Sequence, residues 1–348
     1  MADSAAIRTA IIGYGLSGRI FHAPFIAADP RFSIEAISTS DPARRARAAH
    51  DHPGATVFGS PAELLAQRFD LVVLGSPAHV HLEQGLSALA SGAALVIDKP
   101  FAASVAEAEQ LIAAAASGAL PLIVFQNRRW DGDFLTIRKL LGEGALGQVH
   151  RFESTFERWS PDLRQRWQDT TTPAQGAGIV FDLGSHLVDQ ALQLFGPATL
   201  TAAELSTLRP GAVSPDEGFL SLLHDSGTRS HLTMSRFATR SGPRFRVLGS
   251  TAGYLVDGLD GQEPALVAGA SPADADFGLT PEESWGTLGI DGSDARPVRV
   301  PTERGDYARF YAGVAATIRD GAPPPVDPRD ALAALRIIAR AHEIAGVG

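Results

Sequence analysis

The chain has no cysteine among its 348 residues, and only two of its 30 basic residues, Lys99 and Lys139, are lysines. Without cysteine the protein has no disulfide framework, no thiolate nucleophile, no cysteine-ligated zinc and no iron–sulfur cluster. The chemistry of any site must therefore come from Asp, Glu, His, Lys, Ser, Thr or Tyr side chains, or from a bound cofactor.

Long apolar runs and an excess of positive charge are also missing. No stretch approaches the roughly 18 uninterrupted apolar residues of a membrane span, and the amino terminus lacks the pattern of a secretory signal. Acidic residues outnumber basic ones by 39 to 30, which leaves a net charge of −9. Nucleic acid and anionic membranes are poor partners for such a chain. We expect a cytoplasmic protein whose partner is a small molecule.

What the chain does contain is the composition of a folded protein, with 45% hydrophobic and 20% charged residues. At ~100–200 residues per domain, its length suggests two domains. The hydrophobic period changes after about Phe125, so we divide the chain into a first domain of residues 1–127 and a second of residues 128–348.

The amino-terminal third alternates short apolar runs with helical stretches. Strands are predicted at Arg8–Ile12, Ser33–Ser38, Leu71–Leu74, Leu95–Ile97 and Leu122–Phe125, and helices at Ser17–Ala28, Pro42–Ala49, Val80–Ala90 and Val105–Ala116. Apolar strands separated by helices are typical of a parallel sheet covered on both faces, because each parallel connection needs a crossover. The pattern predicts an α/β domain with a doubly wound sheet.

The rest of the chain has the pattern of an α+β domain. Strands are predicted at Gln148–Arg158, Gly218–His224, Arg229–Ser235, Arg244–Leu248 and Gly253–Val256, and helices at Phe134–Leu141, Ile179–Phe195, Asp306–Arg319 and Asp327–Ile344. Alternation of polar and apolar residues favours a largely antiparallel sheet with one solvated face. The stretch from Gly258 to about Arg299 has weak periodicity, and we expect it to be a long surface excursion.

A glycine-rich hexapeptide follows the first predicted strand and opens a helix. Its residues are Gly13, Tyr14, Gly15, Leu16, Ser17 and Gly18. In the G-x-G-x-x-G pattern the first glycine permits a tight turn, the second lets the backbone approach a pyrophosphate, and the third allows close packing of helix on strand. The free N–H groups of the helix can then bind phosphate. We therefore predict a dinucleotide site here.

The end of the second predicted strand bears on the choice between the two nicotinamide dinucleotides. An NAD site usually carries an acidic residue there, which accepts from the ribose 2′-hydroxyl. This chain has Ser38, Thr39 and Ser40 instead, followed by Arg44. Hydroxyls and a guanidinium suit a 2′-phosphate, so we favour NADP over NAD. Asp41, just beyond this strand, is an acidic residue that would favour NAD. An Asp before proline is, however, also an ordinary cap at the start of a helix.

A set of further motifs resembles one known family, the glucose–fructose oxidoreductase and inositol dehydrogenase (Gfo/Idh/MocA) family. The resemblance covers nearly the whole chain and rests on the glycine loop, residues 76–81 (S-P-A-H-V-H), residues 98–100 (D-K-P), residues 127–130 (N-R-R-W), residues 182–189 (D-L-G-S-H-L-V-D) and residues 305–307 (G-D-Y). The bacterial branch that includes NADP-dependent scyllo-inositol dehydrogenases is the most similar.

The resemblance implies a Rossmann domain that binds the cofactor and an open-faced antiparallel sheet that carries the substrate site. It implies a lysine beside the reacting carbon, which Lys99 matches, and association into a dimer or tetramer. Together with the glycine loop and the second strand end, the cofactor contacts expected from it are Ser76, Pro77, His79, His81, Asp98, Lys99, Asn127 and Arg128. His79 and His81 resemble a metal-ligand pair, but we favour structural or cofactor-lining roles, because they follow a strand end at the cofactor edge.

The candidate catalytic residues are Lys99, Asp182 and His186. Asp182 and His186 are four apart on one predicted helix, so they share a face. Histidine titrates near neutral pH and can accept a proton from a hydroxyl as hydride leaves its carbon, while a lysine ammonium can donate to the same oxygen. The roles of Lys99 and His186 could be exchanged. Asp182 and His186 could also be metal ligands, but the sequence offers no third, so we predict no metal.

Substrate contacts are expected from Asp182, His186, Arg158, Arg166, Trp167 and Tyr307. Guanidinium groups can donate to hydroxyls, and an indole can cover the apolar face of a ring. The arginines could instead form a solvated basic loop. Asp189, one turn beyond His186, could simply cap or solvate its helix.

Two functions follow from these residues. The favoured one is an NADP-dependent oxidoreductase acting on a secondary alcohol of a cyclic polyol or sugar. The alternative is a catalytically silent member of the same fold that binds NAD(P) and serves as a sensor or co-regulator. The presence of Lys99, Asp182 and His186 favours the enzyme.

Overall fold

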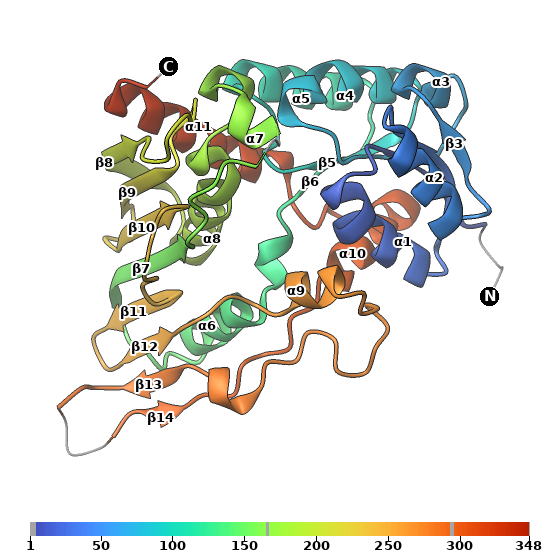
Figure 1. Cartoon of the computed structure of the whole chain (residues 1–348). Coiled ribbons are helices and arrows are strands. Elements are labelled where there is room, and N and C mark those ends of the chain that lie inside the picture. The colour runs from blue at the N-terminus through green and yellow to red at the C-terminus, as the bar shows by residue number, and fades with distance from the viewer. Residues whose placement is uncertain (1–4, 165–166, 293–295, 348) are drawn as a thin grey trace. The chain divides into compact units, whose positions relative to one another are not determined.

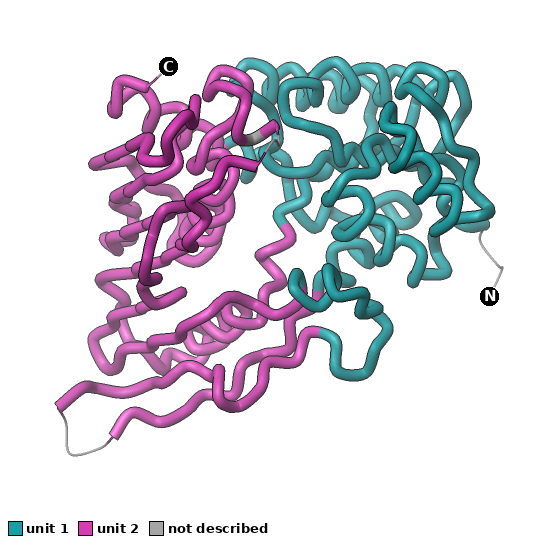
Figure 2. Tube along the Cα trace, in the orientation of Figure 1, with its two compact units in different colours: residues 1–126, 263–277, 307–332 teal, residues 127–262, 278–306, 333–348 magenta. Residues whose placement is uncertain are grey.

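The computed structural model describes residues 5–164, 167–292 and 296–347. The chain forms two compact units, coloured separately in Figure 2. Unit 1 contains residues 1–126, 263–277 and 307–332, and unit 2 contains residues 127–262, 278–306 and 333–348. The sequence division at residue 127 remains a prediction; the compact units change there too, but two later segments return to unit 1.

Unit 1 is built on a six-stranded parallel sheet with the order β3-β2-β1-β4-β5-β6. Its strands are β1 (Ile7–Ile12), β2 (Phe32–Ser38), β3 (Thr56–Phe58), β4 (Leu71–Leu74), β5 (Ala94–Asp98) and β6 (Leu122–Phe125). This is the order of a Rossmann domain, with the carboxyl ends of β1 and β4 side by side where the winding reverses. The predicted doubly wound fold is confirmed.

Helices cover the two faces of this sheet. They are α1 (Ala23–Ala28), α2 (Pro42–Asp51), α3 (Pro61–Leu65), α4 (His81–Ala90), α5 (Val105–Ser117) and α10 (Ala308–Asp320). Figure 1 shows α4 and α5 on one side of the sheet and α1 and α10 on the other. Side-chain caps fix where several helices begin: the carboxylate of Asp41 accepts from the amide of Arg44 at 2.8 Å, and Ser104 caps α5 in the same way.

Some of the predicted elements of unit 1 differ in detail. The strand Thr56–Phe58 and the helix Pro61–Leu65 were not predicted, because three and five residues are too short to show a period. The predicted helix Ser17–Ala28 begins as a π-helix, η1 (Ser17–His22), before α1.

Unit 2 is built on an eight-stranded sheet with the order β14-β13-β12-β11-β7-β10-β9-β8. Its strands are β7 (Val149–Glu157), β8 (Ala198–Ser206), β9 (Glu217–His224), β10 (Arg229–Ser235), β11 (Phe245–Gly249), β12 (Gly253–Val256), β13 (Thr287–Gly289) and β14 (Val298–Arg299). Of the pairings between these described strands, β7 with β10 is parallel and the others are antiparallel. The expectation of a largely antiparallel sheet is confirmed.

The helices that bear on the site in unit 2 are α6 (Gly132–Gly142), α7 (Trp167–Thr170), α8 (Ser185–Phe195) and most of α11 (Pro328–Ala345). A π-helix, η5 (Val180–Gly184), leads directly into α8. Helix α8 packs on β7 and β10, and the residues Phe152, Phe156, Leu232 and Met234 of these strands are buried. Residues that alternate with these on the same strands, such as Thr155 and Thr233, are only partly buried. The sheet therefore has one face covered by helix.

The stretch from Gly258 to Arg299 does not leave the sheet throughout, as the predicted long surface excursion would. It contains α9 (Gln262–Val267) and a short 3₁₀ turn at Glu282–Ser284, and β13 and β14 extend the sheet of unit 2. These elements are two to six residues long, which is why composition concealed them.

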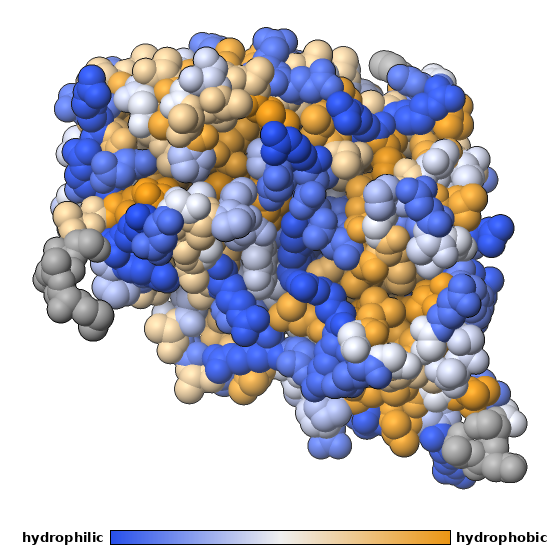
Figure 3. All heavy atoms as spheres, turned by 180° about the vertical axis from the view of Figure 1, so that it is seen from behind, coloured by the Kyte–Doolittle hydropathy of each residue, from blue (hydrophilic) through white to orange (hydrophobic). Residues whose placement is uncertain are grey.

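The surface mixes polar and apolar side chains. In the face shown by Figure 3 the apolar residues form separate patches among polar ones. Within the described ranges, no helix is both long and apolar enough to cross a membrane.

Candidate active site

The glycine loop connects β1 to η1. At two of its glycines, Gly13 and Gly18, a side chain would clash with nearby backbone atoms. Gly13 has φ +92°, and a Cβ atom there would lie 2.8 Å from the carbonyl of Gly75 and 2.9 Å from the amide of Ser76. A Cβ on Gly18 would overlap the carbonyl oxygen of Gly13. At Gly15, by contrast, the nearest atom is Nη1 of Arg44, at 3.6 Å. The middle of the loop is open for a ligand, with a guanidinium beside it.

The side chain of Tyr14, a residue of the predicted cofactor loop, points into the protein. The ring is 2% exposed, and the hydroxyl donates to Oδ2 of Asp51, at the end of α2, over 3.0 Å. Burial, helped by the Asp51 carboxylate, raises the pKa of Tyr14 above its ordinary value. The side chain thus joins the glycine loop to α2, and the backbone of Tyr14 is the part left for the cofactor.

At the end of β2, the predicted cofactor residues divide into buried and exposed ones. Ser38 is 1% exposed, and its carbonyl accepts from the amide of Gly13 at 2.9 Å, so its backbone supports the glycine loop. Thr39 is largely buried as well. Ser40 and Arg44 are exposed, and they remain available to a ligand.

The two histidines that follow β4 have different surroundings. His79 is exposed, whereas His81 is fully buried at the start of α4. Its Nε2 lies 2.8 Å from the carbonyl oxygen of Ser76 and its Nδ1 lies 3.2 Å from that of Phe101. Burial lowers the pKa of His81. The ring supports the two loops at this edge of the sheet, which agrees with the structural role left open for His81.

Lys99 follows the carboxyl end of β5 and is partly buried. Its amide donates to Oδ1 of Asp98 over 2.7 Å. Ligands of doubly wound sheets bind at this edge. Unit 1 therefore brings the glycine loop, the β2 end, Ser76, Pro77 and Lys99 to the same edge of one sheet.

Asp182 and His186 lie in unit 2, on η5 and α8. The spacing of four residues along one continuous helical segment places them on one face. Nη2 of Arg236, just after β10, donates to Oδ2 of Asp182 in a short charge-assisted contact. The Asp182 side chain is 19% exposed, and His186 is 3% exposed. Arg236, which sequence reasoning missed, thus orients the carboxylate of the candidate pair.

The next turn of α8 is held by residues 127–131. The Arg129 guanidinium donates to both oxygens of Asp189, with Nε–Oδ2 at 2.8 Å and Nη2–Oδ1 at 2.6 Å. The side-chain amide of Gln190 donates to the carbonyl of Arg128 at 2.8 Å. Asp189 is 2% exposed, so it is neither a cap nor a solvated residue.

Asn127 and Arg128 are both buried and belong to unit 2, and their assignment as cofactor contacts remains a prediction. The Arg128 guanidinium lies 4.9 Å from the ring centre of Phe156, and its Nη1 donates to Asp131 at 3.1 Å. The N-R-R-W motif is therefore mainly a structural anchor for α8.

The remaining expected substrate residues are scattered. Arg158 is exposed, with its guanidinium 5.8 Å from the ring centre of Phe156, and Trp167 is partly buried at the start of α7. Arg166 lies outside the described residues. Tyr307 is fully buried in unit 1, with its ring centre 6.2 Å from that of Phe25, and its substrate contact remains a prediction.

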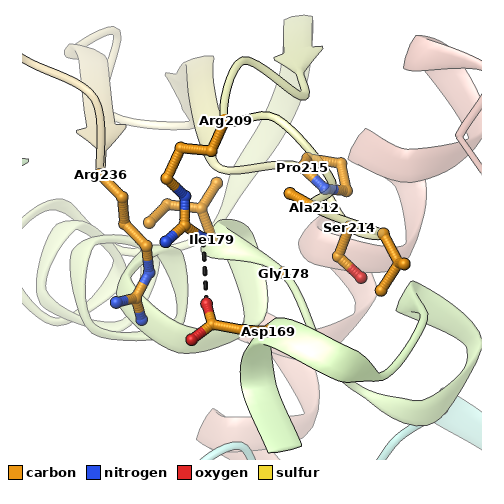
Figure 4. Close-up of a pocket in the computed structure, with 9 residues that line it drawn as sticks. Asp169, Gly178, Ile179, Arg209, Ala212, Ser214, Pro215 and Arg236 are labelled. Carbon is orange, nitrogen blue, oxygen red and sulfur yellow. Dashed lines mark hydrogen bonds and ion pairs between the residues drawn. The ribbon is translucent and has the colours of Figure 1, made fainter. Parts of the chain in front are cut away.

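Arg209, like Arg236, is a buried arginine that was not predicted from the sequence. Figure 4 shows Arg209 and Arg236 reaching toward the same region from neighbouring loops, with Asp169 opposite Arg209. They line a cavity of about 10 Å³, room for about one water. Arginines are common in loops after strands, so the sequence alone does not identify Arg209 and Arg236 as site residues. Among described residues, no three His, Asp or Glu side chains gather as metal ligands would.

Comparisons with known proteins agree with this geometry. Residues 7–126 match the family model "Oxidoreductase family, NAD-binding Rossmann fold", and residues 134–255 match "GFO/IDH/MocA C-terminal domain". The chain is 35% identical to scyllo-inositol 2-dehydrogenase (NADP(+)) IolW of Bacillus subtilis over 97% of this chain and 93% of that protein. It is 36% identical to the uncharacterized oxidoreductase YdgJ of Escherichia coli over 97% and 95%. The solved structure of the putative oxidoreductase yvaA from Bacillus subtilis superposes with a TM-score of 0.93 at 33% identity, covering 99% of this chain and 98% of that one.

Proposed function

The chain belongs to the GFO/IDH/MocA family of oxidoreductases, and we propose that it is an NADP-dependent dehydrogenase of a cyclic polyol or sugar. In this proposal it moves a hydride between the nicotinamide and a secondary alcohol carbon. The observation that carries the proposal is the pair Asp182 and His186 on one helical face, in a chain that also places Lys99 at the ligand edge of a dinucleotide-binding sheet. Association into a dimer or tetramer remains part of the proposal.

The residues of the glycine loop fit a dinucleotide. The space that a Cβ would fill at Gly13 and Gly18 is taken by backbone, while the space at Gly15 is open. Backbone N–H groups at the start of η1 can bind the pyrophosphate. Exposed Ser40 and Arg44 supply a hydroxyl and a cation for a 2′-phosphate, and the similar Bacillus subtilis enzyme is named for NADP(+). These features support NADP over NAD.

The bound nicotinamide supplies the hydride acceptor or donor, and the protein supplies the proton chemistry. We assign His186 to accept the proton of the substrate hydroxyl during oxidation. Lys99 donates a hydrogen bond to the same oxygen and stabilises negative charge as it develops there. Asp182, fixed by Arg236, orients a neighbouring hydroxyl or the Lys99 ammonium. The first two roles are exchangeable, since either side chain can carry the proton.

Polyhydroxylated rings suit the other groups of unit 2. Arg158 is exposed and can donate to ring hydroxyls, and the partly buried Trp167 can cover an apolar ring face. A similar protein is named for scyllo-inositol, which supports an inositol or a sugar of similar size.

The test is a turnover assay with purified protein, NADP or NAD, and a panel of inositols and aldoses, followed at the nicotinamide absorbance band. We expect oxidation of at least one cyclic polyol with a preference for NADP. Normal cofactor binding with no turnover of any panel member would reject the enzyme and favour the sensor.

A further inference from the structure

The loop between β8 and β9, residues 207–216, contacts α7 and the chain that follows it. Nη2 of Arg209 donates to Oδ1 of Asp169, within α7, at 3.0 Å, the contact dashed in Figure 4. The hydroxyl of Ser214 donates to the carbonyl of Thr171 at 2.6 Å. The carbonyl of Pro215 accepts from the amide of Ile179 at 2.8 Å, directly before η5. The β8–β9 loop therefore fixes the α7 turn and the entry to the helix that carries Asp182.

Within the loop, Asp216 fixes Arg209. Nε of Arg209 donates to Oδ2 of Asp216 at 2.9 Å, and the amides of Leu208 and Arg209 donate to the same carboxylate at 2.8 and 3.1 Å. The side chains of Asp169, Arg209 and Asp216 are 2%, 4% and 1% exposed. Burial fixes the conformation of these three side chains. A side chain that rotated away would lose its partner, and water could not replace that partner.

Asp216 also reaches the candidate catalytic carboxylate. Its backbone carbonyl accepts from the amide of Arg236 at 2.9 Å, and the side chain of Arg236 donates to Asp182. Arg209 thus acts on α7 directly and on Asp182 through Asp216 and Arg236.

We propose that Arg209 is a positioning residue for substrate binding, which sets the α7 turn and Asp182 in a fixed relation to each other. The inference rests on the proposed function, because it needs a substrate that contacts both. The segment that Arg209 holds begins with Trp167, the residue expected to cover the sugar or polyol ring. Arg209 itself is buried and does not contact substrate. Arg209 therefore affects specificity for the ring indirectly, through the residues that it holds in place.

A merely structural role for Arg209 would have different consequences. Loosening the fold lowers the midpoint of thermal unfolding and the fraction of active protein, and leaves the KM of the folded fraction unchanged. Loosening the α7 turn raises the KM for polyol while the affinity for NADPH, which unit 1 binds, stays the same.

Two variants separate these roles. Asp169→Asn keeps the shape of the side chain but removes its charge. Arg209→Lys keeps the charge but can reach only one of the two carboxylates. Removing Arg209 outright would leave two buried carboxylates without it and could prevent folding, so the mild variants are preferred. The control is Arg8→Gln, which breaks the exposed ion pair of Arg8 with Asp70 in unit 1.

We expect both variants to raise the KM for polyol about tenfold, with less change in kcat and an unchanged Kd for NADPH by fluorescence titration. Hydrogen exchange at the α7 turn should become faster in both variants and stay at the wild-type rate in Arg8→Gln. An unchanged KM in protein that turns over polyol would overturn the inference and leave the proposed function standing, whatever the exchange rates. A wild-type protein that binds NADPH but oxidises no polyol would reject the proposed function and this role of Arg209 together.

Discussion

The Arg236 guanidinium donates to the Asp182 carboxylate, across 54 residues of sequence. Arg236 follows the end of β10, and Asp182 lies on the π-helix that opens α8. Because the arginine is 6% exposed, the contact is shielded from water on one side. π-Helical turns are rare and frequently lie at functional sites. The contact gives the carboxylate a fixed direction that its own helix does not provide.

Replacing Arg236 should therefore impair the chemical step. We expect Arg236→Gln to lower kcat about 10- to 100-fold, because a misdirected or wrongly hydrogen-bonded carboxylate no longer orients its partner. Arg236→Lys should retain part of the activity, since it keeps the charge. Steady-state kinetics at saturating NADP would measure both. The control is Arg240→Gln, which changes an exposed arginine of the following loop and should behave as wild type. If Arg236→Gln had the same kinetics as this control, Arg236 would have no role in the site.

The Arg129–Asp189 pair should contribute more to stability than to chemistry. Asp189→Leu leaves a buried guanidinium without its bidentate partner, and we expect a loss of about 3–5 kcal/mol in the free energy of unfolding. Replacing both residues by leucine should cost clearly less than the sum of the single changes. Urea titration of the two single variants and the double variant measures this coupling. Additive losses would mean that the two side chains do not act as a pair.

His22 should make the protein less stable in acid. The ring is fully buried in unit 1, its Nδ1 lies 2.6 Å from the hydroxyl of Tyr311, and burial lowers its pKa to about 4. Above pH ~6.5 the histidine is neutral in both the folded and the unfolded state. As pH falls from ~6.5 toward 4, the unfolded chain binds a proton and the folded chain does not, so stability falls by up to about 3 kcal/mol.

The comparison that isolates this effect is His22→Asn, whose amide can occupy the place of Nδ1 but does not titrate. Its free energy of unfolding, measured by denaturant titration between pH 4 and 7, should fall less steeply than that of the wild type. Parallel curves for the two proteins would assign the acid sensitivity to other groups.

The preference for NADP over NAD should depend on the charge of the side chains beside Gly15 and at the end of β2. Thr39→Asp places a carboxylate where a 2′-phosphate would bind, so the ratio of kcat/KM for NADP over NAD should fall. Arg44→Ser should lower the same ratio about tenfold by removing the nearby cation. Arg47→Ser, at an exposed arginine on the same helix, should leave the ratio unchanged. A constant ratio in the first two variants would place the 2′-phosphate elsewhere.

Much of the fold was predictable because its signals are local. Apolar runs such as Leu71–Leu74 form the buried strands, and Asp41 and Ser104 cap their helices as their types suggest. Very short elements, such as β3, carry too few residues to show a period.

The site was predictable in outline, but the direction of its side chains was not. Tyr14 turns toward Asp51, 37 residues away, and Arg129 pairs with Asp189, 60 residues away. Such partners depend on which elements the fold brings together, and a motif does not contain that information. The conspicuous residues of a motif can therefore be anchors, as Arg128 and His81 are, while Arg209 and Arg236 lie in segments with no motif at all.

In the proposed reaction, hydride passes between the nicotinamide and a ring carbon bearing a hydroxyl. Its most direct test follows deuterium from a cyclic polyol labelled on its C–H(OH) carbons into NADP, using mass spectrometry of the recovered cofactor. We predict one deuterium per reduced cofactor with wild-type protein, and a rate reduced at least about 100-fold in Lys99→Met and His186→Asn. Unlabelled NADPH formed during polyol oxidation, or no reduction with any cyclic polyol despite cofactor binding, would contradict the account.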